Sequence, residues 1–220
     1  MELSLSKDQL INYLVHQVNH LFPDNNLLEK KMLDEIIDHS IDRLEYCFSK
    51  VTNSRYKIND KVFYNHLYSD HNIVFYWFIA NTIWKRFGHN QFASKFYYLN
   101  KTMHGFDCMY DTQLPDIFLI FHGVGTMLGK ADYEDYFIAM QGCTVGANRG
   151  KYPVMQKGVS LTANSSVIGD CKIGNNCTIG TNTMLLDTDL NDNHVVFYNK
   201  SGAIESKSSK HIYSKNFFDF

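Results

Sequence analysis

Hydrophobic residues in the first hundred positions recur at intervals of three and four, the spacing that places side chains on one face of an α-helix. This spacing predicts two amphipathic helices, with apolar stripes at Leu10, Leu14, Val18 and Leu21, and at Leu33, Ile36, Ile37, Ile41, Leu44 and Phe48. A nearly continuous apolar stretch predicts a third helix over residues 69–87, with Asp70 as its N-cap and Gly88 as its stop. We expect a fourth helix over residues 91–104 and a loop over residues 51–60.

Beyond about residue 106, a period of six residues replaces the helical spacing. Aliphatic residues or methionine stand six apart at Met155, Leu161, Val167, Ile173, Ile179 and Leu185. Small or β-branched residues follow four positions later, at Val159, Ser165, Cys171, Cys177 and Thr183. The same phase continues upstream at Phe121, Met127, Tyr133, Ala139 and Val145. This period is typical of a triangular parallel β-helix, because each flat side of a coil needs one inward apolar side chain.

One gap interrupts the period of six. Val145 and Met155 are ten residues apart, so four extra residues must leave the coil. We therefore expect residues 147–152 to form a projecting loop. Loops that leave a regular solenoid are common places for function.

The two periods divide the chain into an α+β arrangement. We expect an N-terminal α-helical domain over residues 1–105, a parallel β-helix of hexapeptide repeats over residues 106–200 and a C-terminal tail over residues 201–220. The 21 basic residues nearly balance the 23 acidic ones, which argues against a nucleic-acid-binding protein. Five cysteines without paired spacing indicate no disulfide scaffold. Because the longest apolar run, residues 73–84, is shorter than the ~20 residues of a membrane span, we expect a cytoplasmic protein without membrane insertion.

Several segments resemble the serine acetyltransferase branch of the hexapeptide-repeat acyltransferases. Residues 121–129 (FHGVGTMLG) are similar to that branch's His-containing motif, and residues 140–146 (MQGCTVG) to the stretch before its loop. Residues 153–186 resemble its closing coils, and residues 80–84 (ANTIW) resemble part of the last long helix of its N-terminal domain. The resemblance covers residues 70–198.

This resemblance implies that the β-helix is left-handed and that the chain forms a homotrimer or a dimer of trimers. It implies that acetyl-CoA lies in the groove between neighbouring prisms. It also implies that His122 is catalytic, taking the proton from the hydroxyl of a small-molecule acceptor. Asp107 matches the family's spacing for the carboxylate that orients this histidine, and Asp111 and Asp116 are alternatives.

By the same resemblance, small residues line the acetyl-CoA groove at Gly146, Ala147, Ala163 and Thr178. No metal is expected. His16 and His20 have the spacing of a metal-binding pair on a helix, but no third ligand is apparent, so we expect solvated helix surface. Cys171 and Cys177 are expected to fill small inward positions rather than to do redox chemistry.

The sequence departs from the family in the loop after the catalytic coil. Where the family has Arg-His-Pro, this chain has Lys151-Tyr152-Pro153. Lysine keeps the positive charge but loses the two-pronged hydrogen bonding of arginine, and tyrosine is no base at neutral pH. We assign Lys151 and Tyr152 to acceptor binding. Asp70 is a candidate for the acidic residue that the family's helical domain brings toward the acceptor.

These departures favour an acetyl-CoA-dependent O-acetyltransferase with an acceptor other than free serine. A sugar hydroxyl in bacterial surface-polysaccharide biosynthesis is the main prediction, with the ring of the sugar stacked on Tyr152. A serine O-acetyltransferase of cysteine biosynthesis is the first alternative. A non-catalytic trimeric hexapeptide scaffold is the second.

Overall fold

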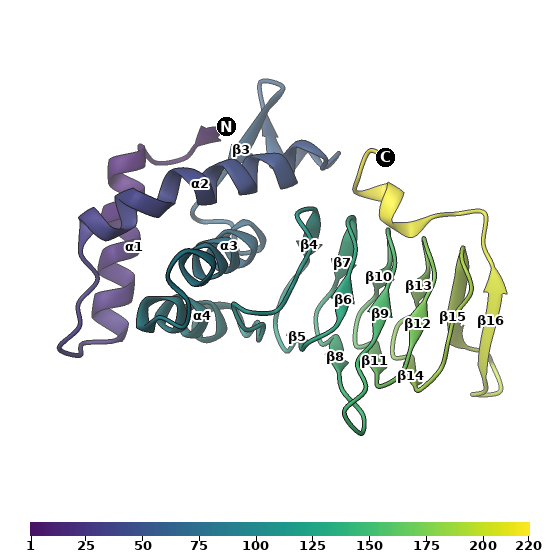
Figure 1. Cartoon of the computed structure of the whole chain (residues 1–220). Coiled ribbons are helices and arrows are strands. Elements are labelled where there is room, and N and C mark those ends of the chain that lie inside the picture. Colours follow the sequence, from purple (N-terminus) through teal and green to yellow (C-terminus); the bar gives the residue numbers. More distant parts are fainter.

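The computed structural model describes residues 1–220 and has two parts that lie side by side (Figure 1). Four helices build the N-terminal part: α1 (Lys7–Leu21), α2 (Lys30–Ser49), α3 (Ser69–Phe87) and α4 (Gln91–His104). The C-terminal part is a parallel β-solenoid with three sides. The helices fall where the apolar spacing predicts them, so the helical N-terminal half and the switch to a coil are both confirmed.

Helix α3 is the centre of the helical part. It packs against α2 and α4, and its side chains are buried from Asp70 to Ile83. Gly88 ends it with a φ of 72°, as expected, but the N-cap position belongs to Tyr68. The prediction that Asp70 is the N-cap is therefore wrong: Asp70 lies within the first helical turn, and its carboxylate accepts a hydrogen bond from the solenoid instead. No helix of the chain is both long and apolar enough to cross a lipid bilayer.

A small sheet covers the start of α3. It consists of β1 (Glu2–Leu3), β2 (Lys57–Ile58) and β3 (Lys61–Tyr64), preceded by the short 3-10 helix η1 (Ser54–Tyr56). Strands β2 and β3 form a tight hairpin, in which Asn59 and Asp60 have positive φ. The prediction of a plain loop over residues 51–60 is therefore wrong in part, because strands of two to four residues are too short to show an alternating pattern.

Three parallel sheets form the sides of the solenoid. The first sheet contains β4 (Phe118–Ile120), β7 (Phe137–Ala139), β10 (Ser160–Leu161), β13 (Thr178–Ile179) and β15 (His194–Tyr198). The second contains β5 (Met127–Leu128), β8 (Thr144–Gly146), β11 (Ser166–Ile168) and β14 (Met184–Leu186). The third contains β6 (Asp132–Tyr133), β9 (Val154–Met155) and β12 (Lys172–Ile173). Each strand pairs with the strand one coil away, so backbone hydrogen bonds run along the solenoid.

The period of six correctly identifies the inward side chains of the later coils. Exposures of 0 to 3 % are found at Met155, Leu161, Val167, Ile173, Ile179 and Leu185. In the first coil the prediction is wrong at Met127, which is 50 % exposed, whereas Leu128 is buried. Eight residues separate the inward Ile120 and Leu128, but six separate their partners Ala139 and Val145. Two extra residues therefore widen the first corner between the first and second sheets and shift the phase.

The predicted projecting loop is confirmed. Val145 and Met155 are ten residues apart, whereas their partners Val167 and Ile173 in the next coil are six apart. The extra residues turn back through two backbone hydrogen bonds between Asn148 and Lys151. This loop protrudes from the solenoid below β8 (Figure 1).

The C-terminal segment returns from the far end of the solenoid to the helices. Strand β16 (Ile204–Ser208) pairs antiparallel with β15 and covers the last coil. We call residues 209–220 the C-terminal strap; they contain the 3-10 helix η2 (Tyr213–Asn216) and run back over the solenoid (Figure 1). The strap ends beside the C-terminal end of α2, where the Asp219 N–H donates to the Lys50 carbonyl.

Aromatic side chains fasten this strap across the first sheet. Phe217 packs against Phe121 with ring centroids 4.8 Å apart. Phe220 stacks on Tyr136 at 4.1 Å, and Phe218 is only 2 % exposed. The strap thus ties the helical part to the first two coils of the solenoid.

Replacing Phe218 with alanine should destabilise the whole chain. Removal of a buried phenylalanine typically lowers the free energy of unfolding by about 3 kcal/mol. Ile204→Ala is the matched control, since Ile204 belongs to the same terminal segment but is 51 % exposed. Urea unfolding followed by circular dichroism measures both variants. Equal unfolding midpoints for Phe218→Ala and the wild type would show that the strap does not support the fold.

Candidate active site

His122 lies at the widened corner between β4 and β5. Its backbone has a φ of 54°, in the left-handed region that non-glycine residues seldom adopt. Its side chain is exposed, and its N–H donates to Asp70 Oδ1 at 3.1 Å. The regular corner positions of the later coils, such as Asn164 and Asn182, have similar φ values but belong to the repeating turn. His122 instead lies in the part of its corner that contains the two extra residues. A residue outside the solenoid, Asp70 of α3, stabilises its backbone conformation.

Asp70 provides that hold from the first turn of α3. Its side chain is buried, at 1 % exposure. Its Oδ2 accepts from the Tyr68 hydroxyl at 3.4 Å, while Oδ1 accepts from the His122 backbone. A carboxylate at a helix N-terminus is further stabilised by the helix dipole. The helical part therefore fixes the position of His122 through a charge-assisted hydrogen bond.

Asp107 pairs with Met127 at the start of β5, just after the same corner. Its N–H donates to the Thr126 carbonyl at 2.9 Å, and its carbonyl accepts from the Leu128 N–H at 2.8 Å. Its carboxylate accepts from the Tyr97 hydroxyl at 2.7 Å and from the Lys101 ammonium at 2.6 Å. The structure shows no hydrogen bond from the His122 ring to this carboxylate.

Neither donor to Asp107 is predicted from the sequence. Tyr97 and Lys101 stand four residues apart on α4, so their side chains lie on one helix face. Burial, with the hydrogen bond to Asp107, raises the pKa of Tyr97, and the Asp107 carboxylate raises the pKa of Lys101. The i, i+4 spacing was visible in the sequence, but nothing there linked it to Asp107.

The two alternative carboxylates lie elsewhere on the solenoid. Asp111 lines a pocket that also contains Tyr152, and Asp116 lines another beside Tyr136 and Lys157. Of the three candidates, Asp107 is the one whose backbone is bonded to the run of residues that follows His122. The choice of Asp107 as the partner of His122 stays a prediction.

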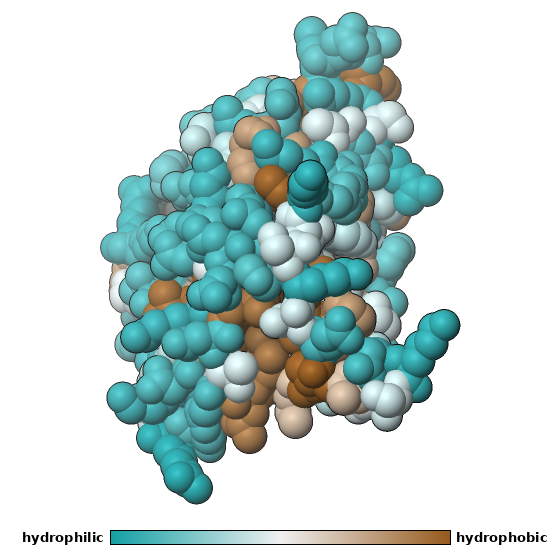
Figure 2. Space-filling model, turned by 90° about the vertical axis from the view of Figure 1, so that its right-hand side faces the viewer, coloured by the Kyte–Doolittle hydropathy of each residue, from teal (hydrophilic) through white to brown (hydrophobic).

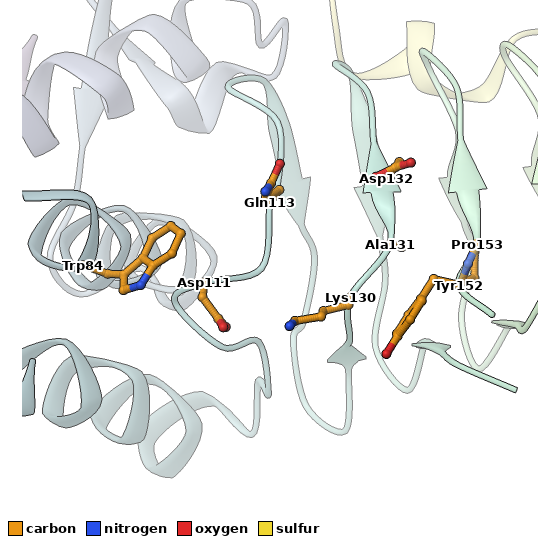
Figure 3. A pocket seen from close by; sticks show the side chains of 8 residues that line it. All are labelled: Trp84, Asp111, Gln113, Lys130, Ala131, Asp132, Tyr152 and Pro153. Atoms are coloured by element: carbon orange, nitrogen blue, oxygen red, sulfur yellow. The ribbon is translucent and has the colours of Figure 1, made fainter. Parts of the chain in front are cut away.

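Tyr152 and Lys151 lie at the opposite corner, between the second and third sheets. Tyr152 is 49 % exposed and borders a pocket of about 490 Å³. Figure 3 shows the side chains around it: Trp84, Asp111, Gln113, Lys130, Ala131, Asp132, Tyr152 and Pro153. In that view Lys130 points toward Asp111 across the pocket. Lys151 is exposed, 3.9 Å from Asp170.

The four residues expected to contact acetyl-CoA do not meet within one chain. Gly146 and Ala147 end β8 beside the projecting loop. Ala163 lies at the corner between the first and second sheets, on the side of His122, and Thr178 begins β13 in the first sheet. All four are at least partly exposed. Their contact with acetyl-CoA stays a prediction.

The remaining candidate residues, two histidines of α1 and two cysteines of the solenoid, form no site of their own. No three histidine, cysteine, aspartate or glutamate side chains gather as a metal site, and His16 and His20 are exposed on α1. Cys171 and Cys177 are buried at the inward small positions, and burial raises the pKa of both thiols. Their sulfur atoms are thereby kept as thiols, which suits packing.

Comparisons with solved structures place this architecture in a known class. No family model and no curated protein matches the sequence. The fold is nevertheless that of a hexapeptide-repeat β-helix protein with a helical N-terminal domain, and it is shared with serine acetyltransferases. The enzyme from Brucella abortus strain S19 aligns with a TM-score of 0.70 at 16% identity, over 93% of this chain and 85% of that chain.

Two liganded serine acetyltransferases align in the same way. A complex with cysteine has a TM-score of 0.69 at 17% identity and covers 94% of this chain and 82% of that chain. A complex with CoA has a TM-score of 0.64 at 16% identity and covers 89% of this chain and 83% of that chain. The similarity confirms the expected fold class, a helical N-terminal domain followed by a parallel β-helix.

Removing the Asp70 carboxylate should release the corner that carries His122. Asp70→Ala leaves the His122 N–H without its acceptor, and loss of a hydrogen bond to a charged group costs about 1.5–3 kcal/mol. Asp70→Asn keeps an acceptor oxygen at the same place and should cost less. Hydrogen exchange of the His122 amide, measured by NMR, should accelerate strongly in Asp70→Ala and mildly in Asp70→Asn. Unchanged exchange in Asp70→Ala would contradict the assigned contact.

Proposed function

We propose that this protein transfers an acetyl group from acetyl-CoA to the hydroxyl of a small acceptor, with serine as the first acceptor to test. The observation that carries the proposal is His122, exposed on a widened coil corner and fixed by Asp70, with Asp107 bonded to the residues that follow this corner. The fold shared with serine acetyltransferases supports the same reaction.

His122 supplies the base that a hydroxyl nucleophile needs. Acetyl-CoA supplies a thioester carbonyl as the acyl donor. The imidazole takes the proton of the acceptor hydroxyl as its oxygen bonds to that carbonyl carbon, and returns the proton to the sulfur when the carbon–sulfur bond breaks. Histidine suits both steps because it titrates near neutral pH. The balance of atoms is complete without a metal, and we expect none.

Asp107 acts as a positioning residue for His122. An ionised carboxylate has about four acceptor sites, and Tyr97 and Lys101 occupy two of them. The remaining sites are available to a ring N–H of His122. A carboxylate in that place selects the histidine tautomer and stabilises the imidazolium that forms.

Serine is supported as the acceptor over the sugar that the loop departures favoured. The structural neighbours are serine acetyltransferases, and one of them is a complex with cysteine, an amino acid of nearly the same size as serine. The retained catalytic corner also argues for an enzyme rather than a silent scaffold. Lys151 and Tyr152 remain the proposed contacts of the loop with the acceptor, and a cytoplasmic location remains a prediction.

A complete site requires a neighbouring copy of the chain. His122 and Tyr152 lie at different corners of one prism, and the residues proposed to contact acetyl-CoA are spread over the first and second sides and two corners. Outward hydrophobic side chains are exposed on the second sheet, at Met127, Met184 and Leu186. Figure 2, which views the end that carries β16, shows hydrophobic side chains gathered in the lower part of the molecule. We propose a homotrimer, alone or as a dimer of trimers, with the site between copies.

Replacing His122 with alanine should abolish most acetyl transfer. General-base catalysis typically contributes about 10²–10⁴-fold, so thiol release from acetyl-CoA with L-serine should fall by that factor. His20→Ala is the control, since His20 is exposed on α1. Undiminished turnover in His122→Ala would overturn the assignment of the base.

A mixing experiment tests the shared site. His122→Ala chains are unfolded and refolded together with chains that carry Lys151→Ala and Tyr152→Ala. If each site takes His122 from one copy and the loop from the next, about a quarter of the sites in randomly mixed oligomers are complete. Activity should therefore reappear in the mixture although both parents are impaired. Activity equal to the average of the two parents would place the whole site within one chain.

A further inference from the structure

The hairpin between η1 and α3 borders an open pocket that reaches Tyr68, two residues before Asp70. We call it the hairpin pocket; its volume is about 430 Å³. The lining residues are Ser54, Arg55, Lys57, Ile58, Phe63, Asn65, Leu67 and Tyr68. Two cations and no acidic side chain line it, whereas the pocket beside Tyr152 contains two aspartates and one lysine. The hairpin pocket therefore attracts negatively charged groups.

The cations of this pocket have no anionic partner in the chain. Neither Arg55 nor Lys57 forms an ion pair, although Lys61 of the same hairpin pairs with Glu2. Arg55 is held by a neutral ring instead: its guanidinium donates to the Tyr68 hydroxyl at 3.2 Å and lies 5.6 Å from the centre of that ring. A guanidinium that is oriented but unpaired keeps its remaining donors for a carboxylate or a phosphate.

A short chain of contacts connects the pocket to the catalytic corner. Arg55 donates to the Tyr68 hydroxyl, which donates to Asp70 Oδ2 at 3.4 Å. Asp70 Oδ1 in turn accepts from the His122 N–H. Three hydrogen bonds, which run through the Tyr68 hydroxyl and the Asp70 carboxylate, thus connect the Arg55 guanidinium to the backbone of His122.

We propose that the hairpin pocket binds an anionic group, a carboxylate or a phosphate, of the molecule whose hydroxyl is acetylated. Arg55 and Lys57 neutralise that group, and Ile58, Phe63 and Leu67 form the apolar wall behind it. This assignment rests on the proposed function. By this assignment the hairpin selects acceptors that carry an anionic group. Lys151 of the same chain is exposed at a different corner of the prism, so it does not take this role.

Paired acceptors test the charge requirement. Turnover is measured with L-serine against L-serinamide, and with glucose 6-phosphate against glucose, which separates a carboxylate from a phosphate. In Arg55→Ala/Lys57→Ala, the kcat/KM for the preferred anionic acceptor should fall about tenfold through KM, the loss expected for one charge-assisted hydrogen bond. The KM for acetyl-CoA should stay constant, and Lys61→Ala should behave like the wild type. Equal use of charged and neutral acceptors, or an unchanged double variant, overturns the proposal.

A binding measurement separates this proposal from the function on which it rests. Inorganic phosphate and acetate are titrated separately into protein labelled at isoleucine and leucine methyl groups. The Ile58 and Leu67 signals should shift, and the shifts should vanish in Arg55→Ala/Lys57→Ala but persist in Lys61→Ala. No shift with either anion overturns the anion site even where acetyl transfer is found. Shifts without turnover on any acceptor keep the anion site and overturn the acetyltransferase.

Discussion

The hydrogen bond between the Asp70 carboxylate and the His122 N–H is the contact on which the site depends. An ionised carboxylate buried without donors costs several kcal/mol, and within α3 itself only the helix dipole and Ser69 stand near it. The solenoid corner supplies the missing donor, so the two parts of the chain complete each other. The same bond holds His122 in a backbone conformation that is uncommon outside glycine. One contact thus sets both the docking of α3 and the geometry of the proposed base.

A regular coil offers no place for such a side chain. Its corners repeat every turn with residues that accept positive φ, such as Gly142 and Asn164, and its inward positions are filled with aliphatic groups. Parallel pairing forces each strand into the register of its neighbours, so extra residues can leave only at corners. The chain inserts residues at two of them: the first carries His122, and the second projects the loop with Tyr152. At both insertions the backbone is not constrained by strand pairing, so His122 and Tyr152 can project from the solenoid.

Periodicity explains what the sequence could predict. The helices and the later coils follow from spacings of three, four and six, because each inward side chain is required by its own turn. The two inserted residues near His122 were missed because Met127 and Leu128 are both apolar, and only pairing with Val145 distinguishes them. The strap was missed because Phe217 meets Phe121 across a large separation in sequence. The hydrogen bonds from Tyr97 and Lys101 to Asp107 depend on how α4 packs against the first coil. A local sequence pattern does not predict this packing.

The position of the site at the junction of the two parts has a physical reason. A triangular prism is convex, so its outer surface cannot surround a small molecule by itself. The helical part adds walls beside the first coil: Asp70 and Tyr68 on one side of His122, and Tyr97 and Lys101 around Asp107. These groups contact the start of the solenoid, so the later coils are left to present a long flat surface. A neighbouring prism can lie along that surface. In the acetyltransferase that we propose, the helices therefore define which hydroxyl reaches the base, and the repeated coils provide the surface for an extended donor and a second subunit.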